Sequence, residues 1–87
     1  MNYSNVSATF ESYGFLTLDC GSFRLPDCEV LFQVSIRGSL VRLYAGLPNK
    51  TPSYILSVEG IPVTPLALAA KHISTFANGQ VTDSVYP

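Results

Sequence analysis

The sequence predicts an α+β domain, a mostly antiparallel meander of about five strands with one C-terminal helix packed on one face. Three observations lead to this prediction. Apolar and polar residues alternate with period two over much of residues 6–59, which is typical of half-buried strands. Helical spacing of apolar residues begins only after residue 63, and single glycines and prolines separate the runs. We expect one domain over residues 1–87, because so short a chain supports a single core.

The first half of the chain is predicted to contain only strands and connections. Alternation of Val6, Ala8 and Phe10 with polar residues indicates a strand over residues 6–11. A turn or bulge at Tyr13-Gly14 then leads to a second strand over residues 15–18. Residues 23–27 are expected to form a connection, since Pro26 cannot donate a ladder hydrogen bond.

The clearest strands are predicted around a hairpin at Gly38, which can adopt positive φ. The hairpin joins strands over residues 28–37 and 40–45, and a loop over 46–52 leads to a further strand over 54–59. One face of the sheet is expected to hold every second residue of these strands: Cys28, Val30, Phe32, Val34, Ile36, Val41, Leu43, Ala45, Tyr54, Leu56 and Val58.

The helix is predicted to begin with Thr64 as N-cap and Pro65 as its first residue. Gly79 is expected to end it. The residues beyond it are predicted to be a frayed end or a final short strand through Val81 and Val85. Apolar residues recur at helical spacing along its length: Leu66, Ala69, Ala70, Ile73, Phe76 and Ala77.

Charge and hydropathy exclude several classes of protein. Charged residues make up 13% of the chain against the usual value of about 25%, whereas a disordered chain needs high charge and low hydrophobicity. Five basic against six acidic side chains argue against a nucleic-acid binder that relies on a basic surface. We expect no membrane association, because no apolar run approaches the ~20 residues of a span. The chain start lacks the pattern of a signal peptide, so a cytoplasmic location is expected.

Catalytic and metal-binding motifs are not recognisable, so the sequence predicts a non-enzymatic protein without a cofactor. The single histidine, His72, lies at the edge of the helix's apolar stripe and is expected to be a surface residue. Cys20 and Cys28 are expected to be reduced thiols. A disulfide between them and a zinc site that adds His72 remain open alternatives, although the spacing is unlike that of known zinc sites.

An apolar second face of the sheet is the feature that points to function. Leu31 faces away from Val30 and Phe32, and an uncovered apolar patch of this kind marks a protein–protein surface. The charge deficit favours a partner, since a lone monomer with so few charges is harder to keep soluble. The predicted docking residues, with arginines at the rim, are Leu31, Arg37, Leu40, Arg42, Tyr44 and Ile55.

The sequence therefore predicts a small protein-interaction module that docks on another protein, on a second copy of itself as a homodimer, or on both. An inhibitor or adaptor of a larger assembly fits this description, and small accessory proteins of phages or mobile elements are of this kind. The alternative is a module for single-stranded nucleic acid that uses Arg24, Arg37, Arg42 and Tyr44. A third hypothesis, a small enzyme, needs a pocket around His72 with a nearby acid.

Overall fold

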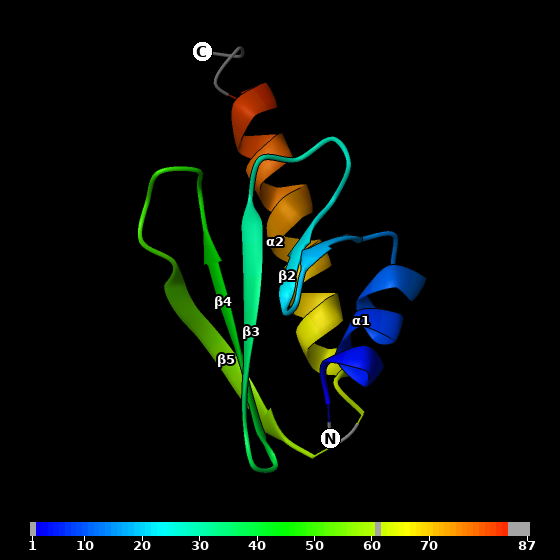
Figure 1. Cartoon of the computed structure of the whole chain (residues 1–87). Coiled ribbons are helices and arrows are strands. Elements are labelled where there is room, and N and C mark those ends of the chain that lie inside the picture. Colours follow the sequence, from blue (N-terminus) through cyan, green and yellow to red (C-terminus); the bar gives the residue numbers. More distant parts are fainter. Residues whose placement is uncertain (1, 61, 84–87) are drawn as a thin grey trace.

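The computed structural model describes residues 2–60 and 62–83, and the surroundings of side chains up to Phe76. The sheet consists of five antiparallel strands in the order β1-β2-β3-β4-β5, so the predicted α+β architecture is confirmed. One helix precedes the sheet and one follows it (Figure 1). In chain order the elements are α1 (Tyr3–Ser12), β1 (Leu16–Asp19), β2 (Ser22–Arg24), β3 (Leu31–Arg37), β4 (Leu40–Gly46), β5 (Ser53–Glu59) and α2 (Thr64–Asp83).

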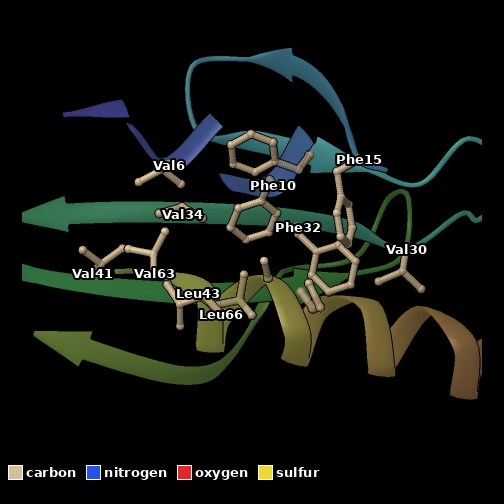
Figure 2. Packing of buried hydrophobic residues seen from close by; sticks show 14 of the residues in the cluster. Val6, Phe10, Phe15, Val30, Phe32, Val34, Val41, Leu43, Val63 and Leu66 are labelled. Carbon is tan, nitrogen blue, oxygen red and sulfur yellow. The ribbon is translucent and has the colours of Figure 1, made fainter. Parts of the chain in front are cut away.

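The hydrophobic core lies between one face of the sheet, here called the inner face, and the two helices. In β4 every second side chain is buried, and in β3 Phe32 and Val34 are buried while Ile36 is half-buried against the core, as the alternation predicts. Figure 2 shows side chains of both helices and of the strands pointing into one cluster. The buried members from the strands are Phe23, Phe32, Val34, Val41, Leu43 and Ala45, and those from the helices are Val6, Phe10, Leu66, Ala67 and Ala70.

Four phenylalanines connect α1 to the strands. The ring of Phe10 in α1 stacks on Phe23 of β2 with centroids 4.4 Å apart, and meets Phe15 edge-on at 5.2 Å. Phe15 in turn packs edge-on against Phe32 of β3 at 5.7 Å. Such aromatic pairs add directional attraction to the burial of apolar area, so they fix how α1 lies on the sheet.

The prediction of a strand over residues 6–11 is wrong, because this segment lies within helix α1. Asn2 caps the helix, and its side-chain oxygen accepts a hydrogen bond from the Asn5 amide at 3.1 Å. Val6 and Phe10 are four residues apart and both fully buried, which satisfies a helix as well as a strand. Ala8, the residue between them in the alternating pattern, is exposed. The helix ends before Gly14, which has a φ of 93°.

Three other predicted boundaries differ from the structure. The expected connection over 23–27 contains strand β2, which ends at Arg24 before the proline. Strand β3 begins at Leu31 rather than Cys28, although Cys28 and Val30 are still buried. The third is the start of α2: the Val63 carbonyl accepts from the amides of Leu66 and Ala67, so the helix starts one residue earlier than predicted.

The end of α2 also differs from the prediction. The helix continues through Gly79 to Asp83, since a glycine inside a helix costs only about 1 kcal/mol and does not stop it. The prediction of a final strand through Val81 is therefore wrong, because Val81 lies in α2. Val85, the other residue of that predicted strand, lies outside the described residues. Neither α1 nor the described part of α2 is both long and apolar enough to cross a membrane.

Candidate docking surface

The face of the sheet opposite the helices, here called the outer face, carries side chains that are only partly covered. In Figure 1, α2 passes behind β2 and the upper part of β3, while β4 and β5 lie mostly to the left of the helix. Leu40, Arg42 and Tyr44 of β4 point the other way from the buried Val41 and Leu43, and all three are half-buried. Their remaining exposed area is available to another molecule.

A depression of about 360 Å³ lies on this outer face, across the last two strands of the sheet. It is shallow and open to solvent. Arg42 lies opposite Ser57 and Tyr44 opposite Tyr54, so the depression follows the cross-strand pairs of β4 and β5. Its lining consists of Leu40, Arg42 and Tyr44 from β4 and of Tyr54 and Ser57 from β5.

Two tyrosines define the shape of this depression. Their rings, Tyr44 and Tyr54, meet in a T-shaped arrangement with centroids 5.9 Å apart and planes at 69°. The Tyr54 hydroxyl donates a hydrogen bond to the Ser57 hydroxyl at 3.0 Å. Tyr54 remains 55% exposed, which makes it the most accessible aromatic side chain of the described sheet.

A β-bulge places Tyr54 on the outer face. Leu43 pairs with Leu56, but the next residue, Tyr44, pairs with Tyr54, so Ile55 is the extra residue of β5. Leu56 and Ile55 both pack against the core. The prediction that Tyr54 shares a face with Leu56 is therefore wrong. Ile55 does not lie on the outer face as predicted.

The six predicted docking residues are thus only partly brought together. Leu40, Arg42 and Tyr44 line the depression. Arg37 is exposed and pairs with Leu40 at the hairpin end of the sheet, beside the depression. Leu31 is half-buried and pairs with Gly46 at the opposite end of β4, outside the lining. Sequence reasoning missed Tyr54 and Ser57, because the pattern of apolar residues contains no sign of the bulge.

The guanidinium of Arg24 donates hydrogen bonds to the loop that follows β2. One terminal nitrogen of its guanidinium, Nη1, lies 3.3 Å from each of the carbonyl oxygens of Leu25, Pro26 and Cys28. This arrangement orders the connection between β2 and β3. Of the four residues of the nucleic-acid hypothesis, Arg24 is therefore engaged within the chain, while Arg42 and Tyr44 share the depression.

The other candidate residues are scattered. His72 is exposed on α2, and the two cysteines are free, with Cys20 exposed and Cys28 buried beside the Ser74 carbonyl. Within residues 2–60 and 62–83, no three histidine, cysteine, aspartate or glutamate side chains are grouped so as to hold a metal ion.

The contrast between the two thiols can be measured. In the native protein we expect iodoacetamide to label Cys20 alone, because Cys28 is only 5% exposed and its thiolate cannot meet the reagent. Intact-mass spectrometry should show one added group, and two after unfolding in urea. The Cys20→Ser variant is the control and should take up none while folded. Rapid double labelling of the native chain would contradict the burial of Cys28.

Comparison with known proteins gives no match to a family model, to a curated protein or to a solved structure.

Proposed function

We propose that this chain is a non-enzymatic interaction module that docks another protein onto its outer face, at the depression between β4 and β5. The observation that carries the proposal is the grouping of Leu40, Arg42, Tyr44 and Tyr54 on a face that no described element covers. Tyrosine and arginine are enriched among residues that dominate binding energy. The docked protein is a different protein or a second copy of this chain.

Peptide display tests the proposal even while the partner protein is unidentified. A random-peptide library is panned on the immobilised chain, and enriched peptides are measured in solution by fluorescence anisotropy. We expect Tyr54→Ala to weaken the binding of these peptides by at least about tenfold, as for a residue central to an interface. Phe76→Ala, on α2, is the matched control, because Phe76 is a similarly exposed aromatic at 61% against 55%. It should change affinity by less than about twofold.

Two results would contradict docking at this face. One is the absence of enriched peptides together with a single-chain mass of 9.4 kDa by light scattering. The other is a loss of affinity in Phe76→Ala but not in Tyr54→Ala, which would move the binding surface to α2. A mass of two chains that returns to one in Tyr54→Ala would identify the docked protein as a second copy.

Binding of single-stranded nucleic acid is the second candidate, favoured by one observation. Arg42 lies next to two tyrosines on a sheet face, and such faces stack bases while arginine meets the backbone. Anisotropy with a labelled oligo(dT) at low salt tests it, because low salt strengthens phosphate contacts. Submillimolar binding that is lost in Tyr54→Ala would favour this function, and its absence would leave protein docking.

A further inference from the structure

We infer that the depression takes a glutamate or aspartate side chain from a short extended segment of the partner protein, with an apolar neighbour of that residue beside it. The inference rests on the proposed function and gives the chemistry of its partner. Its basis is the set of hydrogen-bonding groups in the lining, the charge of the surrounding face and the size of the sheet.

The lining is rich in donors. Arg42 brings five N–H groups and the only formal charge among the lining residues. The Ser57 oxygen accepts from Tyr54, which leaves the Ser57 hydroxyl hydrogen free to donate. None of the described lining residues is acidic. A carboxylate accepts two parallel hydrogen bonds from a guanidinium, so it complements this set of donors.

The rest of the lining is apolar. The Leu40 side chain and the two tyrosine rings flank Arg42 along the strand direction. An aliphatic side chain two residues from the carboxylate along an extended segment points to the same side, and would meet these groups. The expected motif is therefore one acidic residue with aliphatic residues near it, rather than a run of acidic residues.

The size of the outer face favours a segment over a second copy. Strands β1 and β2 have four and three residues, and β3, β4 and β5 have seven each. With strands about 4.8 Å apart and a rise of about 3.3 Å per residue, the outline of the five strands is about 440 Å². A stable interface buries about 800 Å² on each partner. The outline is about half of this area, so the face favours a few extended residues over a stable dimer.

The charge on this face favours a carboxylate over a nucleic-acid backbone. A single strand presents one phosphate per nucleotide, and its binding needs several cations along a groove. The depression has one arginine, and Glu59 lies on the neighbouring cross-strand pair, opposite Leu40. One cation matches the single charge of one carboxylate, whereas a chain of phosphates would bring further negative charges near Glu59, which repels them.

A pair of matched peptides tests the inference. Capped Leu-Ser-Glu-Ser-Leu and Leu-Ser-Gln-Ser-Leu, whose leucines are two residues from the central side chain, are titrated into the ¹⁵N-labelled chain, and amide shifts of residues 40–44 and 53–57 are followed. We expect the glutamate peptide to bind about tenfold more tightly, as for a hydrogen bond to a charged group. Arg42→Gln should remove this difference, and Arg42→Lys should keep part of it.

Arg37→Gln is the matched control, because Arg37 is an exposed arginine of the same face outside the depression. It should leave the preference for glutamate within about twofold. Equal binding of both peptides, no shifts in these segments, or a preference unaffected by Arg42→Gln would overturn the acidic partner. Peptides from the display library that still depend on Tyr54 would then leave the docking function standing. If oligo(dT) displaces the glutamate peptide and this displacement requires Arg42, the acidic partner would be overturned in favour of a phosphate ligand.

Discussion

Replacing Phe10 with alanine should lower the free energy of unfolding by about 3–5 kcal/mol, as expected for a buried phenylalanine in a packed core. The side chain has no exposed area, and it contacts both Phe15 and Phe23. The substitution would leave a cavity between α1 and the first two strands. Urea denaturation followed by circular dichroism measures the loss, which is a large part of the stability of a small domain.

Phe76→Ala is the control for this experiment, since the same atoms are removed from a side chain that is 61% exposed. A surface change of this kind should alter stability by no more than about 0.5 kcal/mol. A loss below about 1 kcal/mol in Phe10→Ala would mean that α1 does not pack on the sheet through this cluster.

Gly21→Ala should destabilise the fold by about 2–4 kcal/mol, from backbone strain together with overpacking. Gly21 has a φ of 84°, a conformation that costs other residues about 1–2 kcal/mol. A Cβ atom there would also lie 2.9 Å from the Val34 carbonyl oxygen and 2.9 Å from Cε1 of Tyr3. The Val34 amide donates to the Gly21 carbonyl at 2.8 Å, so moving the backbone away would weaken a bond between β3 and this turn.

Gly60→Ala separates these two causes. Gly60 has a similar φ of 73°, but nothing lies within 4 Å of the position that its Cβ would occupy. It should therefore show the backbone strain alone, about 1–2 kcal/mol. Thermal unfolding of both variants gives the comparison. Equal losses would show that the strand and Tyr3 do not approach Gly21 as closely as described.

The central hairpin could be predicted well because burial and alternation agree there. Phe32, Val34, Val41 and Leu43 all lie on the inner face, and the turn residue Gly38 has a φ of 59°. A strand with one face against the core and one toward solvent must alternate, so its register is readable from apolar residues alone.

Helix α1 could not be distinguished from a strand by the same criterion. Val6 and Phe10 are four positions apart, a spacing that puts two residues on one side of a helix and also on one face of a strand. The cap at Asn2 is the signal that favours a helix, because its side chain accepts from the amide three residues later. At α2, the favourable packing of the preceding turns outweighs the weak helix propensity of Gly79.

The docking surface could be predicted on β4 but not on β5. The outward position of Leu40, Arg42 and Tyr44 follows from the regular alternation of side chains between the two faces of a strand. On β5 the bulge interrupts this alternation at Ile55, which turns Tyr54 outward and leaves Ile55 against the core. A bulge depends on pairing between two strands, and no single run of residues reveals it.

Chemical-shift mapping of a display-selected peptide on the ¹⁵N-labelled chain tests the docking surface most directly. Docking at the depression predicts that the largest amide shifts fall in residues 40–44 and 53–57. The other large exposed apolar side chains of the described residues are Leu68 and Phe76 on α2, Leu16 and Leu18 on β1, and Leu47 in the loop after β4. Shifts confined to α2 or to β1, with β4 and β5 unchanged, would contradict docking at the depression.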